Sequence, residues 1–238
     1  MRHPLYAMAL CICVVAGLLA CGVAPNDPDG PTHQRPPDSR LDPTGYAELS
    51  QQHVDAVFAE QQAGFSVCSR KAGGAFVGGV ARLMFLLRPD GRVEHVYVAE
   101  SDVGSLEVER CLLTAARFME FPVPPGSGRT RFVRAFPVNP AARGTVAEQP
   151  ESWGYPTIRG QRKPIRKCRA DYGYDGPFHL TTFIGGRGRA LSAGFHARHN
   201  SPDGFADCVV RVIEETSFPD TGGQVVKYRA LVEYLPDD

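Results

Sequence analysis

The sequence has no excess of charge of either sign, because 26 Lys and Arg residues are balanced by 26 Asp and Glu residues in 238. Chains that bind nucleic acid usually carry a basic excess, so this balance argues against a nucleic-acid partner. Tryptophan occurs only once, which weighs against a carbohydrate-binding surface made of clustered aromatic residues. Apolar residues at 43% and aromatic residues at 9% are ordinary globular values, so the chain as a whole is not disordered.

Cysteine is also sparse, and its spacing argues against two kinds of site. Seven cysteines are few for a disulfide-dense toxin scaffold. No pair has the close C-x₂₋₄-C spacing of a zinc site or the C-x-x-C of a redox motif. The glycine cluster 185–188 is not a dinucleotide fingerprint, because it joins two predicted strands rather than opening a helix. We therefore expect no metal and no cofactor.

The N-terminus has the parts of a secretory signal, namely a short basic start and an uncharged stretch from Leu5 to Ala24. The tetrad Leu18-Leu19-Ala20-Cys21 resembles the lipobox of bacterial lipoproteins. That resemblance implies cleavage of residues 1–20, thioether lipidation of Cys21 and acylation of the new amino terminus, as with palmitate. Gly22 then favours delivery to the outer membrane, facing the periplasm. The alternative is an uncleaved transmembrane helix, because a stretch of this length can span a bilayer.

Residues 21–43 are predicted to form a tether that holds the folded part away from the membrane. Six of these residues are proline. Proline at this density cannot build a core and favours an extended, semi-rigid backbone.

Residues 44–140 predict a first folded unit. Apolar side chains at helical spacing indicate an amphipathic leading helix that ends at Gly64. The apolar run 82–88, a turn at residues 89–91 and the apolar residues of 93–98 predict a hairpin. A helix from about Ser105 to Phe118 and a strand at 131–138 complete the unit. The face of the leading helix consists of Tyr46, Leu49, His53, Val54, Val57, Phe58 and Gln61.

The same order of features recurs in the second half of the chain. Gly91 precedes Cys111 by 20 residues, and Gly188 precedes Cys208 by 20 residues. A Phe-Pro pair begins 10 residues after each of these cysteines, at Phe121 and at Phe218. Several coinciding intervals indicate a repeat, and we expect both phenylalanines to be buried in equivalent cores.

The second copy is predicted to have strands at 178–184, 189–197 and 225–234. Its helix should be capped by Ser201, with Pro202 at the first helical position. No counterpart of the leading helix is evident, so residues 141–163 are predicted to be a linker and residues 164–238 a second, divergent domain. The predicted fold class is α+β, with a small antiparallel sheet packed by a helix in each unit.

Four cysteines besides Cys21 remain in the mature chain, and they allow three pairings. An exported protein can form disulfide bonds. The repeat favours two bonds, because equivalent positions should make equivalent bonds. The favoured pairs are Cys68 with Cys111 and Cys168 with Cys208.

The order of helix, Cys, hairpin, helix with a second Cys, Phe-Pro and closing strand resembles the AgmX/PglI C-terminal domain family, which is related to the TonB C-terminal domain. The resemblance covers about residues 46–140, and a core from Cys168 to Tyr234 in the second copy. It implies two tandem TonB C-terminal-like units and protein–protein interaction in the cell envelope. It supplies no catalytic residue.

Other candidate sites have a simpler structural interpretation. His196 and His199 point to opposite faces of a strand, although His179 is expected near His196 across the hairpin. Ser66 and Cys68 lack an evident His or Asp partner for a nucleophile. A basic cluster is interpreted either as a solvated linker or as a contact for anionic lipid, lipopolysaccharide or an acidic partner. This cluster consists of Arg159, Arg162, Lys163, Arg166, Lys167 and Arg169.

Together these features predict a non-enzymatic lipoprotein of the cell envelope. We expect it to bind an envelope protein partner, or to act as a scaffold in a transport or motility assembly, while its lipid anchor holds it at the membrane. The expected mechanism is addition of a partner strand to an exposed sheet edge. The alternatives are a carbohydrate- or peptidoglycan-binding module and, third, a hydrolase.

Overall fold

The structure is a computed structural model that describes residues 46–71, 76–124, 128–139, 146–197, 201–202 and 204–233. All of these belong to one compact unit, Ser39–Asp238. The predicted signal 1–20, Cys21 and the tether 21–43 lie outside the described residues, as does His199. The described part is α+β, which confirms the predicted fold class.

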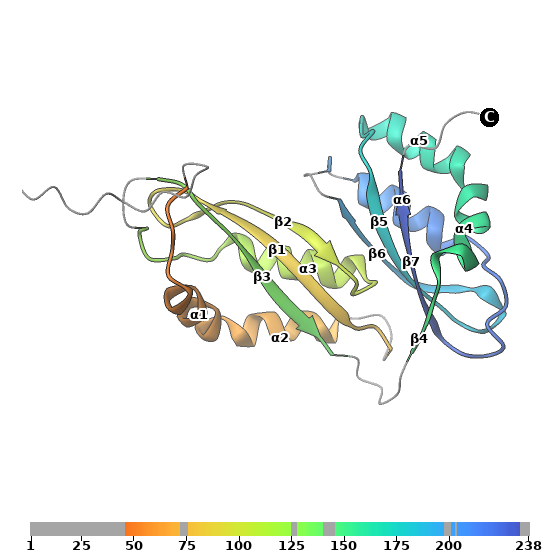
Figure 1. Ribbon diagram of the computed structural model, residues 1–238, viewed down its shortest axis with the longest axis horizontal. Coiled ribbons are helices and arrows are strands. Elements are labelled where there is room, and N and C mark those ends of the chain that lie inside the picture. The colour runs from red at the N-terminus through yellow and green to blue at the C-terminus, as the bar shows by residue number, and fades with distance from the viewer. Residues whose placement is uncertain are drawn as a thin grey trace, which may run out of the picture. The chain divides into compact units, whose positions relative to one another are not determined.

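The first half of this unit is a three-stranded antiparallel sheet covered by helices (Figure 1). Its strands are β1 (Gly79–Leu87), β2 (Val93–Ser101) and β3 (Thr130–Val138), in the order β2-β1-β3. The helices are α1 (Gln51–Glu60), α2 (Gln62–Arg70) and α3 (Leu106–Arg117). Ser50 and Ser105 cap α1 and α3 by accepting from a backbone N–H in the first turn. The predicted hairpin, second helix and third strand are thereby confirmed.

The second half repeats this arrangement. Its strands are β5 (Phe178–Ile184), β6 (Ala190–Ala197) and β7 (Val226–Val232), with the short β4 (Ala147–Gln149) added parallel to β7. The order is β4-β7-β5-β6, so the last three strands match the order of the first sheet. The glycine cluster 185–188 joins β5 to β6 and contains a short 3₁₀ turn, η1 (Gly186–Gly188). Helix α6 (Phe205–Glu214) corresponds to α3.

The prediction that the second copy lacks a leading helix is wrong. Residues 151–172 form α4 (Glu151–Gly160) and α5 (Arg162–Tyr172), which break at Gln161 as α1 and α2 break at Gln61. Ile158 and Ile165 are buried in the second core, as Phe58 and Phe65 are in the first. Most of the predicted linker 141–163 is therefore packed structure.

Two helix boundaries also differ from those expected. Gly64 lies inside α2 rather than ending the leading helix, because the break falls at Gln61. Helix α6 begins at Phe205 instead of at Pro202, and Ser201 is not its cap. Gly204 has a left-handed conformation with φ 85°, and this conformation prevents the helix from extending back to Pro202.

Each half has its own hydrophobic core and its own disulfide bond. Cys68 is bonded to Cys111 and Cys168 to Cys208, with Cα–Cα distances of 5.4 and 5.7 Å. These are the pairs that the repeat spacing favours. Each bond joins the second leading helix to the helix that follows the hairpin, so it fixes two helices over one face of a sheet.

Phe121 and Phe218 are both buried, at 5% and 6% exposure. The Phe121 N–H donates to the Gly91 carbonyl at 3.0 Å, and the Phe218 N–H donates to the Gly188 carbonyl at 2.8 Å. The same residues therefore close the same turn in both halves. This correspondence supports the interpretation of the chain as a repeat.

Candidate functional site

The outer edge of β3 is flanked by a groove. β3 pairs with β1 along its whole length. On its far side the Ala47 N–H donates to the Arg129 carbonyl at 2.7 Å, just before the strand begins, and among the described residues no other named strand pairs with the rest of this edge. The groove has a volume of about 540 Å³ and runs between this edge and helices α1 and α2. Three buried rings, Phe58, Phe65 and Phe136, belong to its lining. The helix side of the groove consists of Asp55, Phe58, Ala59, Gln62, Phe65, Ser66 and Ser69.

Two arginines of β3 pack against aromatic rings near this groove. Arg134 forms an ion pair with Asp55, and its guanidinium carbon lies 5.1 Å from the centre of the Phe58 ring. Arg131 lies 4.7 Å from the centre of the Tyr46 ring. Val133 is 48% exposed and, because side chains alternate along a strand, lies on the same face as Arg131 and on the face opposite Arg134. The strand thus presents a cation on each face, and the cation on the groove side is Arg134.

The equivalent edge in the second half is covered. β4 pairs with the first three residues of β7. Further along β7, the Leu231 N–H donates to the Glu151 carboxylate at 3.4 Å. Arg229 of β7 forms an ion pair with Glu148 of β4 at 3.2 Å. Both edges therefore have a main-chain contact at their start, from Ala47 on β3 and from β4 on β7, and they differ further along, where the Leu231 N–H of β7 is bonded to Glu151.

The edge of β6 meets the first half through Glu109 of α3. The Glu109 side chain is fully buried and accepts a hydrogen bond from the Phe195 N–H of β6 at 3.0 Å. Its other oxygen accepts from the Ser101 hydroxyl at 2.6 Å. Burial raises the pKa of this carboxyl to about 7, although the two donors and Arg110 act in the opposite direction. No local pattern in the sequence indicates this role, because Glu109 stands beside Val108 as an ordinary polar residue of a helix.

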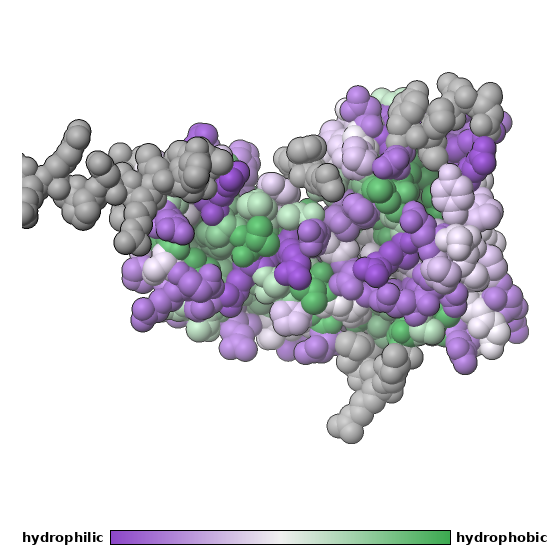
Figure 2. Space-filling model, viewed as in Figure 1, coloured by the Kyte–Doolittle hydropathy of each residue, from purple (hydrophilic) through white to green (hydrophobic). Residues whose placement is uncertain are grey.

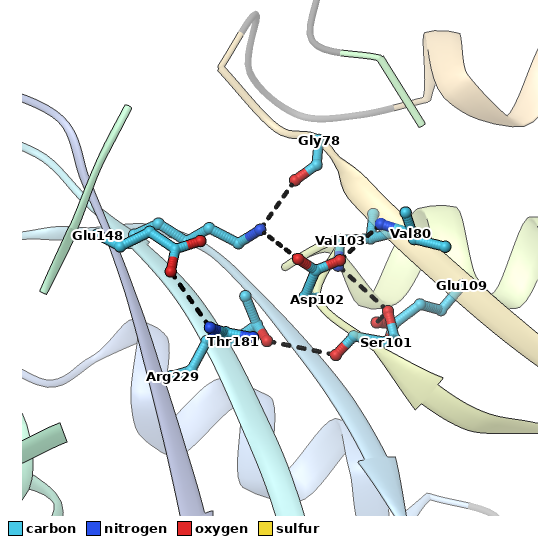
Figure 3. Close-up of polar contacts among 10 residues, drawn as sticks. Gly78, Val80, Ser101, Asp102, Val103, Glu109, Glu148, Thr181 and Arg229 are labelled. Carbon is cyan, nitrogen blue, oxygen red and sulfur yellow. Dashed lines mark hydrogen bonds and ion pairs between the residues drawn. The ribbon is translucent and has the colours of Figure 1, made fainter. Parts of the chain in front are cut away.

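Further polar contacts tie the two halves together around residues 101–104 (Figure 3). The Ser192 hydroxyl donates to the Gly104 carbonyl at 2.7 Å, and the Lys227 ammonium bonds the Asp102 carboxylate at 2.9 Å. Burial raises the pKa of Asp102, but the Val80 N–H and Lys227 outweigh it and hold the pKa below its ordinary value. A Cβ on Gly104 would lie 2.6 Å from the Phe183 ring, so this close approach requires glycine.

His179 and His196 lie across the β5–β6 hairpin, as expected, with ring centres 4.6 Å apart and planes nearly parallel. Burial lowers the pKa of His196 to about 4, and the charge of His179 acts in the same direction. Within the described residues, no group of three or more His, Cys, Asp or Glu side chains is placed to hold a metal ion.

The nucleophile candidates are engaged in structural contacts. The Ser66 hydroxyl donates to the Ala63 carbonyl at 2.8 Å, and Cys68 is disulfide-bonded. The single Trp153 is half-buried and stacks parallel to Phe218, with ring centres 6.3 Å apart. It therefore contributes to packing more than to an exposed aromatic platform.

The predicted basic cluster lies on helices and is not a linker. Five of its residues lie on α4 and α5, at positions 159–167. The sixth, Arg169, is buried, donates to the carbonyls of Gly176 and Glu233, and lies over the Phe178 ring. Arg169 is thus a structural residue and is separate from the other five.

None of the helices in the described part of the chain has the length and apolar character needed to cross a membrane.

Comparison with known proteins gives little further guidance. No protein-family model matches the chain, and no curated protein matches it. Among solved structures, the chain is similar to one described as HasB CTD, with 20% sequence identity and a TM-score of 0.29. The match covers 52% of this chain and 94% of that one. A TM-score at this level does not establish a shared fold.

Proposed function

We propose that this protein is a non-enzymatic binding protein of the cell envelope, and that it takes up a strand of a partner protein at the open edge of β3. The observation that carries the proposal is the contrast between equivalent edges. Beyond the contact of Ala47 with Arg129 at its start, β3 has no second strand partner among the described residues, whereas β7 is covered by β4 and, further along, by Glu151. An open edge offers main-chain hydrogen bonds, and an adjoining groove can accept the side chains of the added strand.

The chemistry of the groove fits a peptide with mixed side chains. Its aromatic floor, formed by Phe58, Phe65 and Phe136, suits an apolar side chain. Its walls of Gln62, Ser66 and Ser69 suit polar groups of the partner backbone. Ser66 and Cys68 are held in structural contacts, which favours binding over nucleophilic catalysis as the role of this region.

The proposed location rests on the N-terminal sequence. We propose that Cys21 is lipidated and that the tether 21–43 connects it to the folded unit. Mass spectrometry of the protein extracted from membranes should then find an acylated Cys21 as the first residue. A mature chain that still contains Arg2 would contradict this assignment.

Site-specific photocrosslinking in intact envelopes tests the strand-binding site. Ala135 of β3 pairs with Arg82, and Leu231 of β7 pairs with His179, so the two residues occupy equivalent edge positions. A photoreactive residue at Ala135 should give a defined crosslinked product with a second protein. The same residue at Leu231 should not, because that edge is closed. Equal products at both positions, or none at Ala135, would contradict the proposal.

A second pair of variants tests whether the groove takes part. Ala59→Trp places a large ring in the groove beside β3 and should abolish the product formed at Ala135. Arg159→Trp, at the equivalent position of the second half, should leave that product unchanged. Circular dichroism and disulfide mapping of both variants would check that they are folded.

A further inference from the structure

We propose that the exposed side chains of Phe118 and Val123, in the segment that follows α3, lie in the interface of a phospholipid bilayer. Phe118 is 83% exposed and Val123 is 69% exposed, whereas every other large apolar side chain among the described residues is at most 48% exposed. Single apolar residues at a surface are normal, but two strongly exposed ones in one short segment indicate an interaction site. The inference rests on the anchoring proposed above for the N-terminal segment, and it does not depend on strand binding at β3.

Comparison of the two halves shows that the fold does not require apolar residues at these two positions. The closing phenylalanines and the glycines of the hairpin turns are each 97 residues apart in the two halves. At this offset Phe118 corresponds to Glu215, and Val123 corresponds to Asp220. Both helices end at this point with a similar backbone, with φ −99° at Phe118 and φ −82° at Glu215. Because the same local structure forms with acidic residues, the apolar pair is explained by what it contacts.

Contacts connect this segment to the point where the described chain begins. Glu120 forms an ion pair with Arg92 at 3.5 Å, just before β2 starts. Glu94 of β2 forms an ion pair with Arg129 at 2.8 Å, and the Arg129 carbonyl accepts from the Ala47 N–H. The end of α3, the start of β3 and residues 46–47 therefore lie at the same end of the first sheet, on the left in Figure 1. Figure 2 shows hydrophobic side chains at the surface of this end, among hydrophilic ones.

The position of the proposed anchor favours a bilayer as the partner of this surface. The tether 21–43 ends close to Tyr46, so the lipid proposed on Cys21 is connected to the end of the sheet that presents Phe118. A tether keeps the unit at a high effective concentration near the membrane, so even a contact of two side chains is populated there. Phenylalanine and aliphatic side chains suit the boundary between headgroups and acyl chains, where proteins on a membrane surface place their apolar residues.

This contact does not require charge attraction to the lipid. Three arginines at this end of the sheet each form an ion pair with an acidic residue of the first half. The pairs are Arg88 with Asp90, Arg92 with Glu120, and Arg129 with Glu94. The contact is therefore expected to depend on the removal of apolar surface from water, which salt does not screen. A weak dependence on salt distinguishes it from the binding of acidic headgroups by charge.

Photocrosslinking to lipid tests this proposal on phosphatidylcholine vesicles. A chain of residues 22–238 with a hexahistidine tag before residue 22 is held on the vesicles by a nickel-chelating lipid, which takes the place of the lipid on Cys21. A photoreactive residue at Val123 should form a lipid adduct, seen as an increase in protein mass by one phospholipid. The same residue at Asp220, its counterpart in the second half, should form little adduct. The yield at Val123 should change by less than about 2-fold as salt rises from about 0.05 to about 0.5 M.

Substitution of Phe118 tests whether this side chain contributes to the contact. With the photoreactive residue at Val123, Phe118→Glu introduces the residue of the second half and should lower the adduct yield at least about 5-fold. Phe118→Leu keeps an apolar side chain, and its yield should stay within about 2-fold of the original chain. Val67→Glu adds the same charge at an exposed position of α2 and should also leave the yield unchanged. Circular dichroism and disulfide mapping would check that each variant is folded.

Three outcomes in vesicles would overturn the proposal. They are the absence of a lipid adduct at Val123, equal yields at Val123 and Asp220, and an unchanged yield in Phe118→Glu. If Phe118→Glu does not fold, the comparison of Val123 with Asp220 in the otherwise original chain still decides.

The full chain in intact envelopes provides a further test. A photoreactive residue at Val123 should again give a lipid adduct, and a product with a second protein instead would overturn the proposal. Failure of this proposal can be distinguished from failure of the proposed function. The tag supplies the anchor in the vesicles, so the result there does not depend on lipidation of Cys21. Strand binding is probed separately, at Ala135.

Discussion

The most informative single residue is Glu109, because its carboxyl is buried between the two halves. Its pKa is raised to about 7 in the folded protein, from an ordinary value of 4.5. Between these two values the folded state binds more protons than the unfolded state. The free energy of unfolding therefore decreases as pH rises through this window. The full effect of the shift is about 3 kcal/mol, and it is retained below pH 4.5 and lost above pH 7.

Replacing Glu109 by Gln tests this linkage. An amide keeps an oxygen that can accept from the Phe195 N–H, but it does not titrate. Urea unfolding at pH 5 and at pH 8 should show the original protein losing stability relative to Glu109→Gln as pH rises. The comparison must be between variants, because His196, with its pKa lowered to about 4, makes a contribution of opposite sign. Parallel pH profiles of the two proteins would contradict a titrating Glu109.

A second prediction at the residue scale concerns Phe121 and Phe218, which close the same end of each core. Phe121 contacts the rings of Phe58, Phe85 and Phe132. Replacing either phenylalanine by Ala should lower the free energy of unfolding by about 3–5 kcal/mol, because the vacated space cannot fully collapse. Chemical denaturation measures the loss, and Phe118→Ala is a suitable control because Phe118 is 83% exposed. A cost below 1 kcal/mol for Phe121→Ala would contradict the burial.

At the scale of elements, the turns at Gly91 and Gly188 have the same conformation and the same packing in both halves. Both glycines have positive φ, at 83° and 71°, and a Cβ on either would collide with the carbonyl oxygen of the Phe in the same half. Replacing either glycine by Ala should therefore lower the free energy of unfolding by more than the strain of a left-handed alanine alone would, because the new Cβ also collides with that oxygen. Gly222→Ala provides the control, because Gly222 has φ 66° but open space around it. The thermal unfolding midpoints of both turn variants should lie well below the midpoint of the control. Equal midpoints for the three variants would contradict this packing.

Most of the sheet elements could be predicted from the sequence, because their signals are local. The apolar run of β1, the turn at Pro89-Asp90-Gly91 and the capping Ser105 all lie within a few residues of what they determine. Helix α4 cannot be predicted from the sequence in the same way, because it contains Gly154 and Pro156, which usually indicate non-helical structure. Gly154 is needed for space, since a Cβ there would lie 2.6 Å from the Tyr228 ring across the fold. When a residue is required by a contact that is distant in the sequence, the residues next to it give no indication of that requirement.

The sequence predicts that the candidate site is an exposed sheet edge, but it does not predict which strand forms that edge. Only the structure identifies the open edge. Glu109 and Glu151 cover their edges through contacts with Phe195 and Leu231, which are 86 and 80 residues away in the chain. Long-range contacts of this kind leave no periodic pattern in the sequence.

At the scale of the whole described unit, the two halves are expected to unfold together. The second sheet contributes Phe183 to the first core, and Glu109, Asp102 and Gly104 of the first half are bonded to β6 and β7. Disrupting one half therefore removes partners that the other half needs. The single Trp153 lies in the second half against Phe218 and Tyr228, so its fluorescence reports that half alone.

The variant Leu83→Ala tests this coupling, because Leu83 is fully buried in the first core. The change should cost about 2–5 kcal/mol, and the denaturation midpoint reported by Trp153 should fall together with the midpoint from far-UV circular dichroism. Leu180→Ala, in the second core, provides the reciprocal comparison and should shift both signals in the same way. If Leu83→Ala moves the circular dichroism transition but leaves the Trp153 transition in place, the halves unfold independently. The contacts of Glu109 and Lys227 would then be too weak to couple the unfolding of the two halves.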